Sequence, residues 1–154
     1  MIKTSKLLDF FKKKKAEKII IRCDIDFITI NETLLVFPTN YTTLVHILGK
    51  PDREIKKTNY YMFWDVHGIY CSYTNSQYIL SINAYQYTNN NIKNNSIYAT
   101  KKLFSGELYL NEERITYSEF GKISLGKVAI HRLGKETDFR LGFNVGINKI
   151  YAKK

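Results

Sequence analysis

The chain has 154 residues, of which 44% are hydrophobic and 25% are charged, and it contains two cysteines. This length suits one domain that can bury a core without disulfides or metals. No stretch is long and apolar enough for a membrane-spanning helix, which excludes a helical integral membrane protein.

The net charge of +10 is concentrated at the two ends of the chain. Residues 1–18 hold seven lysines and carry +5, and residues 149–154 add +3, which leaves only +2 for residues 19–148. This distribution argues against a basic nucleic-acid groove in the body of the chain. We divide the sequence into a basic N-terminal extension over 1–18 and a single α+β domain over 19–154.

The N-terminal extension is expected to form a short helix over residues 4–15. Its lysine run is typical of a solvated helix end. Alternatively, the run and the adjacent leucines and phenylalanines form a weak contact with an anionic membrane or with nucleic acid. Asp9 interrupts the apolar cluster, so the segment does not resemble a signal peptide and we expect a cytoplasmic protein. The run consists of Lys12, Lys13, Lys14 and Lys15.

Residues 19–37 alternate like two strands joined by a hairpin turn at Asn31-Glu32, with a break near Phe27 where the alternation changes parity. A helix over 41–48 follows. Thr39 or Asn40 can cap its start, and Gly49 with Pro51 marks its end.

The rest of the chain is predicted to be mostly strands. Turn residues separate 59–64, 69–74 and 78–85, so these three segments are expected to form an antiparallel meander. Further strands are expected over 106–110, 114–118, 128–132 and 139–144. The fold class predicted from this pattern is α+β: an antiparallel sheet of meander and hairpins, with one or two helices packed on one face.

No catalytic motif is present in the sequence. Asp65, His67 and Cys71 could together bind a metal or form a catalytic site, but turn geometry explains Asp65 and core alternation explains Cys71. Cys23 also lies in an apolar alternating run, so both cysteines are expected to be buried core residues. We therefore expect a protein that is not an enzyme and holds no cofactor or metal.

An aromatic run supplies the candidate partner-binding residues. Strand alternation divides the run between two faces, of which one can pack in the core. The other face is either covered by the second half of the chain or exposed as anchors for a protein partner. The candidate anchors are Tyr60, Tyr61, Phe63, Trp64 and the nearby His67.

Short motifs form a pattern across the middle of the chain. They are Phe37-Pro38, Leu48-Gly49-Lys50-Pro51-Asp52-Arg53, Trp64-Asp65-Val66-His67-Gly68-Ile69 and Phe104-x-Gly106-x-Leu108. In these motifs, over about residues 28–118, the chain resembles an uncharacterised family of small bacterial proteins with the pattern F-P, L-G-K-P-x-R, W-D-x-x-G-I. The resemblance implies structural roles for Gly49, Pro51, Asp65 and Gly68.

A looser similarity links the helix and meander to β-lactamase-inhibitor-like domains and to outer-membrane-assembly lipoprotein domains. Both resemblances imply a non-catalytic protein-binding module, with immunity or inhibitor proteins of bacteria as the analogy. The alternatives are a peripheral binder of anionic membrane or nucleic acid through the basic N-terminus, and an enzyme built around Asp65, His67 and Cys71.

Overall fold

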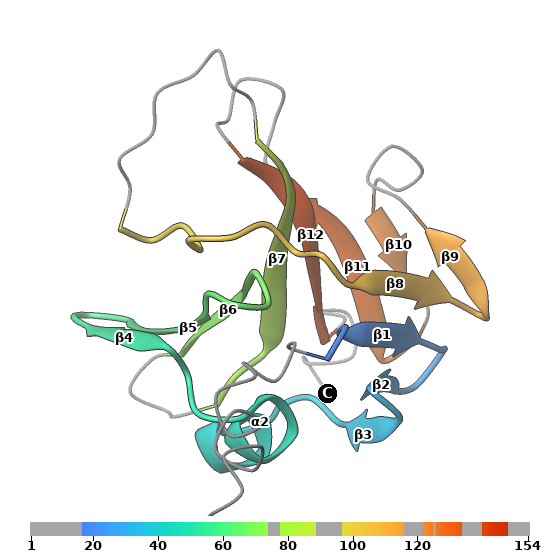
Figure 1. Ribbon diagram of the computed structural model, residues 1–154. Coiled ribbons are helices and arrows are strands. Elements are labelled where there is room, and N and C mark those ends of the chain that lie inside the picture. The colour runs from blue at the N-terminus through green and yellow to red at the C-terminus, as the bar shows by residue number, and fades with distance from the viewer. Residues whose placement is uncertain are drawn as a thin grey trace, which may run out of the picture.

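The computed structural model describes residues 17–73, 78–88, 97–115, 122–124, 126–133 and 140–147. Within these residues the chain forms two β-sheets with a shared core and one short helix, a β-sandwich-like fold (Figure 1). The prediction of an α+β fold with helices covering a single sheet is therefore wrong. The segments that were predicted to be strands of one sheet form two separate sheets. The smaller sheet, and not a layer of helices, covers most of the apolar face of the larger one.

The smaller sheet has five strands in the order β3-β2-β1-β8-β9. The strand β1 runs parallel to β8 and antiparallel to β2, so it joins two hairpins that lie far apart in the sequence. The strands are β1 (Ile20–Cys23), β2 (Ile28–Ile30), β3 (Thr33–Leu35), β8 (Glu107–Leu110) and β9 (Glu113–Ile115).

The same dipeptide closes both hairpins of the smaller sheet. The φ angles are 47° at Asn31 and 68° at Glu32, and 47° at Asn111 and 71° at Glu112. Positive φ at both central residues defines the type I′ turn, whose twist matches that of the flanking strands. The turn predicted at Asn31-Glu32 is confirmed. The break predicted near Phe27 is a turn between β1 and β2.

The larger sheet has seven antiparallel strands in the order β10-β11-β12-β7-β6-β5-β4. The predicted meander is confirmed as three neighbouring strands of this sheet. The edge strand next to them was not predicted. The strands are β4 (Arg53–Lys56), β5 (Tyr60–Trp64), β6 (Ile69–Tyr73), β7 (Ser81–Thr88), β10 (Lys122–Ser124), β11 (Val128–Leu133) and β12 (Arg140–Ile147).

The helix α2 (Tyr41–Leu48) lies at one end of the two sheets (Figure 1). The Asn40 side chain accepts a hydrogen bond from the Thr43 backbone N–H at 2.9 Å, and Gly49, with φ of 81°, ends the helix. Both predicted boundaries are confirmed. In the part of the chain that the structure describes, no helix has the length and apolar character that crossing a bilayer requires.

The core lies between the two sheets and receives residues from both, together with two residues of α2. Both cysteines face this core and are free thiols, as predicted. The predicted helix over 4–15 and the lysine run Lys12, Lys13, Lys14 and Lys15 lie outside the described residues. The largest fully buried side chains are Trp64, Phe63, Phe143, Ile21, Ile28, Ile30, Leu35, Leu44, Met62, Ile69 and Ile79.

Candidate functional site

Two of the sequence motifs meet beside the strands β4 and β5. Trp64 Nε1 donates a hydrogen bond to the Gly49 carbonyl at 2.7 Å, which ties the helix end to the larger sheet. Arg53 donates from Nε to Asp65 Oδ2 at 2.7 Å and from Nη2 to Asp65 Oδ1 at 3.3 Å. We call this ion pair the Arg53–Asp65 clamp.

The clamp also holds a distant stretch of backbone. Arg53 donates to the carbonyls of Ile97 at 2.6 Å and Ala99 at 2.7 Å. The backbone N–H of Lys101 donates to Asp65 Oδ1 at 2.7 Å. The clamp therefore fixes residues 97–101 against the β4–β5 end of the larger sheet, just before the chain enters β8.

The electrostatics of the clamp favour an ionised carboxylate. Burial alone would raise the pKa of Asp65, but hydrogen bonds from Arg53 and the Lys101 N–H, with the charges of both residues, hold that pKa below its usual value. The Arg53 guanidinium also lies over the Phe63 ring, 3.9 Å from its centroid. The polar groups of both residues are thus engaged in holding the backbone.

Gly68 allows this stretch to approach the turn between β5 and β6. Its φ is 71°, and a side chain there would collide with the backbone of Leu103 and Phe104. A residue without a Cβ is therefore required at this position. Of the four residues to which the resemblance assigns structural roles, Gly49 ends the helix, Asp65 and Gly68 make the contacts described above, and Pro51 is buried in the same region.

The predicted partner-binding aromatics divide into buried and half-buried residues. Trp64 is 1% exposed and faces the core, while Phe63 is 0% exposed on the opposite face of the sheet, so neither ring is available on the surface. Tyr60 stacks on Tyr73 with 5.1 Å between ring centroids. Tyr60 and Tyr61 are both half-buried.

Other tyrosines cover Phe63 from outside the core. Its ring centroid lies 5.7 Å from that of Tyr70, which in turn stacks on Tyr85 at 5.4 Å. Tyr61 packs against Tyr98 with 4.9 Å between centroids. Burial raises the pKa of Tyr70, and its hydroxyl lies 3.2 Å from that of Tyr85. This face of the aromatic run is thus packed mainly against the protein's own side chains.

The candidate metal or catalytic trio is not brought together as a site. Asp65 is held by the clamp, and Cys71 is buried in the core, where burial raises its pKa to about 12. His67 is half-buried in the turn, and burial lowers its pKa against the opposing charge of Asp52. Among the described residues, no group of three or more His, Cys, Asp or Glu side chains could hold a metal ion.

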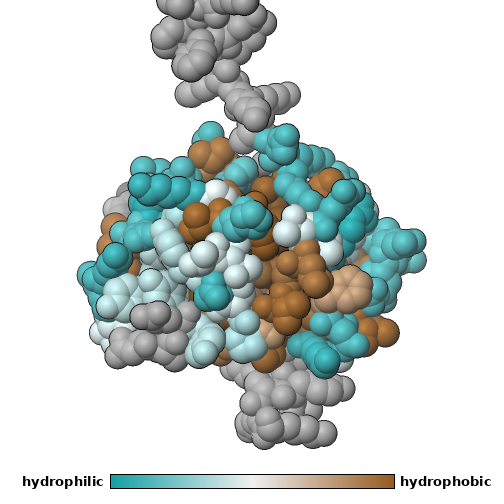
Figure 2. Space-filling model, turned by 90° about the horizontal axis from the view of Figure 1, so that it is seen from below, coloured by the Kyte–Doolittle hydropathy of each residue, from teal (hydrophilic) through white to brown (hydrophobic). Residues whose placement is uncertain are grey.

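A surface that sequence reasoning missed lies at the end of the molecule formed by β3 and α2. Hydrophobic residues gather there on one face (Figure 2). Leu34 is 56% exposed, Val36 is 58% exposed and Leu80 is 50% exposed. We call these three residues, with the exposed Pro38, the apolar strip.

An isolated backbone bridge places Leu80 beside Pro38. Thr39 and Ile79 exchange backbone hydrogen bonds at 2.9 and 2.8 Å in an antiparallel bridge, and both are buried. Successive side chains of an extended backbone point to opposite sides, so Pro38 and Leu80, which flank this bridge, face solvent together. The strip therefore spans the end of both sheets.

The strand β3 is an edge of the smaller sheet, and its backbone is suited to pairing with another strand. Ile30 and Thr33 flank a two-residue turn and form a hydrogen-bonded pair, so the next pair, Thr29 and Leu34, is a non-hydrogen-bonded one. The N–H and C=O of Leu34 consequently point away from β2, toward the open edge. No strand among the described residues pairs with this side of β3. The unpaired backbone groups of an edge strand are a template for an added strand.

The sequence did contain a signal for this surface. Residues 34–37 read Leu-Leu-Val-Phe, which is apolar at successive positions and not at alternate ones. Such a run indicates a strand with two apolar faces. In the structure Leu35 faces the core, while Leu34 and Val36 face solvent.

One comparison with known proteins gives a match. A family model described as a domain of unknown function (DUF7738) matches residues 20–125. It confirms the expectation of an uncharacterised family. No curated protein and no solved structure matches the chain.

Proposed function

The chain belongs to the DUF7738 family, and we propose that it is a non-catalytic protein-binding module that docks a partner on the apolar strip and the β3 edge. The observation that carries this proposal is three large apolar side chains, each at least half exposed, beside an edge strand. Exposed apolar groups that gather in this way are typical of interaction sites.

The strip and the edge together define the kind of partner. An extended segment paired with β3 would exchange backbone hydrogen bonds with Leu34. Its apolar side chains at alternate positions would cover Leu34 and Val36. Removing each half-exposed side chain from water contributes about 1 kcal/mol, which suits a modest, specific affinity.

The clamp supports the non-catalytic part of the proposal. The polar motif residues Arg53 and Asp65 are engaged with each other and with the backbone at Ile97, Ala99 and Lys101. Their chemistry stabilises a chain path. A carboxylate that serves as a general base needs a free face toward a substrate.

Peptide selection tests the proposal directly. The full-length protein is immobilised and used to select binders from a displayed library of random peptides, and the enriched peptides are titrated against variants. We expect alternating apolar residues in the enriched peptides, and at least tenfold weaker binding to Leu34→Glu and Val36→Glu. Val66→Glu, at an exposed position in the β5–β6 turn, should bind like wild type. Equal binding by all variants would contradict the proposal.

The immunity or inhibitor role is the narrower form of this proposal, in which the partner is a toxin. The apolar strip would then bind over the functional site of that toxin. The wild-type protein should inhibit the toxin in an activity assay, and Leu34→Glu should inhibit it far less. Unchanged inhibition by this variant would show that the apolar strip does not carry the inhibitory role.

The charge of the N-terminal extension favours a second candidate. Seven lysines within residues 1–18 would attract an anionic membrane or nucleic acid. Full-length protein is compared with a variant in which Lys12, Lys13, Lys14 and Lys15 are all replaced by Gln. Salt-sensitive binding to anionic vesicles or to DNA that this variant loses would support the candidate. Equal, negligible binding by both proteins would contradict it.

A further inference from the structure

A groove of about 390 Å³ lies on the outer face of the smaller sheet, over β1 and β2. Its lining includes Arg22 and Thr29, whose neighbours Ile21 and Ile28 face the core, so both side chains point outward. Phe27, from the turn between β1 and β2, is 43% exposed beside them. No residue of the apolar strip lines this groove, so it is a separate surface.

The side chains that line the groove are accessible. Arg22, Glu32 and Glu112 are exposed, and Asp24 is half-buried. The accessible lining is nevertheless mainly apolar, because the Phe27 ring and the carbon stems of the polar side chains contribute to it. A ligand in this groove therefore contacts apolar and charged groups together.

The groove carries negative charge in a protein whose net charge is +10. It has three carboxylates, from Asp24, Glu32 and Glu112, and one guanidinium, from Arg22, which gives a net charge of −2. The Arg22 guanidinium lies over the Tyr109 ring of β8, 4.4 Å from its centroid. No lysine or arginine among the described residues forms an ion pair with any of the three carboxylates. The groove therefore favours a cationic group.

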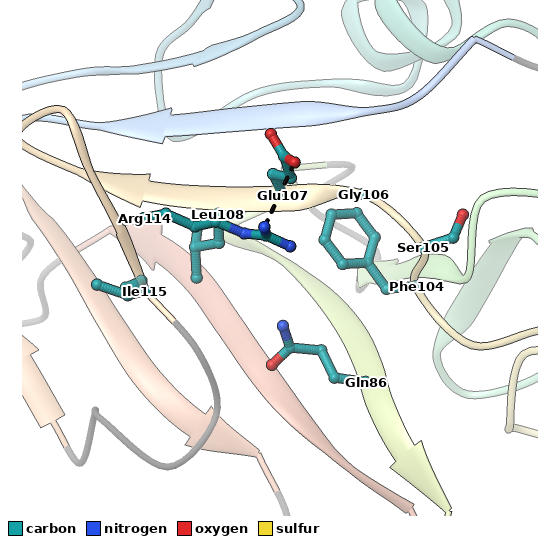
Figure 3. A pocket seen from close by; sticks show the side chains of 8 residues that line it. All are labelled: Gln86, Phe104, Ser105, Gly106, Glu107, Leu108, Arg114 and Ile115. Atoms are coloured by element: carbon teal, nitrogen blue, oxygen red, sulfur yellow. Dashed lines mark ion pairs between the residues drawn. The ribbon is translucent and has the colours of Figure 1, made fainter.

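Glu107 shows the contrast with a carboxylate that the fold itself neutralises. It lines a different pocket, where Arg114 lies beside it (Figure 3) with 3.7 Å between Nη1 and Oε1. Lys18 Nζ lies 2.6 Å from the same oxygen, and the Tyr109 hydroxyl donates to Oε2 at 2.8 Å. The carboxylates of the groove have no such partners among the described residues, so their charge is left for a ligand.

We propose that the groove receives a lysine side chain of the partner that docks on the β3 edge. Glu32 directly precedes β3, so the groove begins at the end of the strand with which that partner pairs. Because this lysine belongs to the same partner, its presence rests on the function proposed above, to which it adds a basic residue beside the alternating apolar ones.

The chemistry of lysine matches the lining. Four methylene groups pack against Phe27, and the compact ammonium group lies among the three carboxylates. The volume of the groove equals that of about thirteen waters at roughly 30 Å³ each, which is room for one such side chain.

Peptides selected on the immobilised full-length protein supply the probe. We expect the enriched peptides to carry a lysine at a fixed distance from their alternating apolar residues. Replacing that lysine by norleucine keeps the apolar stem and removes the charge. The change should weaken binding about fivefold and reduce its salt dependence. In NMR spectra, the lysine peptide should shift the ring signals of Phe27.

Two double variants that lose the same charge locate the contact. Glu32→Gln with Glu112→Gln should remove the difference in affinity between the lysine and norleucine peptides. Glu17→Gln with Glu54→Gln, at exposed carboxylates outside the groove, is the control and should keep that difference.

The outcomes separate the lysine site from the docking on β3. Enriched peptides with alternating apolar residues but no lysine preference would overturn the lysine site alone, as would a preference that both double variants keep. Lysine-dependent binding that Leu34→Glu does not weaken would contradict the docking on β3 alone. Tighter peptide binding by the variant that lacks the lysines at 12–15 would show that the chain's own lysines fill the groove, and would overturn the assignment to a partner.

Discussion

Arg53 and Asp65 form a two-point ion pair, with 2.7 Å between Nε and Oδ2 and 3.3 Å between Nη2 and Oδ1. Arg53 is the first residue of β4, and Asp65 directly follows the last residue of β5. Together they hold three backbone groups of residues 97–101. The pair therefore links parts of the chain that are more than thirty residues apart and sets the path into β8.

Breaking this pair should destabilise the protein strongly. The Asp65 side chain is only 7% exposed and that of Arg53 is 24% exposed, so Arg53→Ala leaves a buried carboxylate without its cation. We expect the free energy of unfolding to fall by about 3 kcal/mol. Urea unfolding measures it, with Lys56→Ala as the control.

The control removes an exposed ion pair. Lys56 Nζ lies 3.6 Å from Glu54 Oε2, and the Lys56 side chain is 64% exposed. Its loss should change the free energy of unfolding by less than about 0.5 kcal/mol. If Arg53→Ala and Lys56→Ala cost the same, the clamp does not stabilise the fold as described.

The clamp should also make the free energy of unfolding depend on pH. The folded state holds the pKa of Asp65 below the value of 3.8 that the group has without the fold. This contribution is therefore fully present above about pH 5, and it is lost as the pH falls through the folded-state pKa. Urea unfolding between about pH 5 and pH 2 should show a steeper loss for wild type than for Asp65→Asn. Parallel curves would be inconsistent with a depressed pKa.

Two glycines with positive φ should differ in their tolerance of alanine. A methyl group at Gly68 collides with the Leu103 and Phe104 backbone, whereas at Gly49, with φ of 81°, no atom lies within 4 Å. Gly49→Ala should cost about 1–3 kcal/mol from backbone strain alone. Gly68→Ala should cost clearly more, because the backbone of residues 103 and 104 must also move. Thermal unfolding of the two variants compares them, and an equal loss would contradict the close approach at Gly68.

The two cysteines should be unreactive in the folded protein. Burial raises the pKa of both Cys23 and Cys71 to about 12, so the reactive thiolate is scarce at neutral pH. A thiol reagent at pH 8 should modify neither residue under native conditions and both in denaturant. Rapid modification of one cysteine in the native protein would show that its side of the core opens.

Local features were predictable because neighbouring residues determine them. Asn40 and Gly49 fix the helix boundaries, and short turns fix the meander. The division into two sheets was not predictable in this way, because the parallel pairing of β1 with β8 joins Ile20–Cys23 to Glu107–Leu110 without any signal at either segment. The sequence pattern was therefore assigned to one sheet, with helices to cover it.

The candidate site depended even more on long-range contacts. Phe63 is an aromatic strand residue like Tyr61, and only its contacts with Tyr70 and Arg53 show that it is covered. Leu34 and Val36 are ordinary strand residues until β3 is known to be an edge. Exposure and edge position are properties of the assembled sheet, so a single sequence does not reveal them.

Amide hydrogen exchange at Leu34 shows whether the β3 edge receives a partner strand. Exchange at this residue is measured in the free protein and in its complex with a selected peptide. We expect rapid exchange of the outward-pointing Leu34 N–H in the free protein and strong protection in the complex, with little change at the neighbouring Leu35. Unchanged exchange at Leu34 on saturation with the peptide would contradict the pairing of a partner strand with β3.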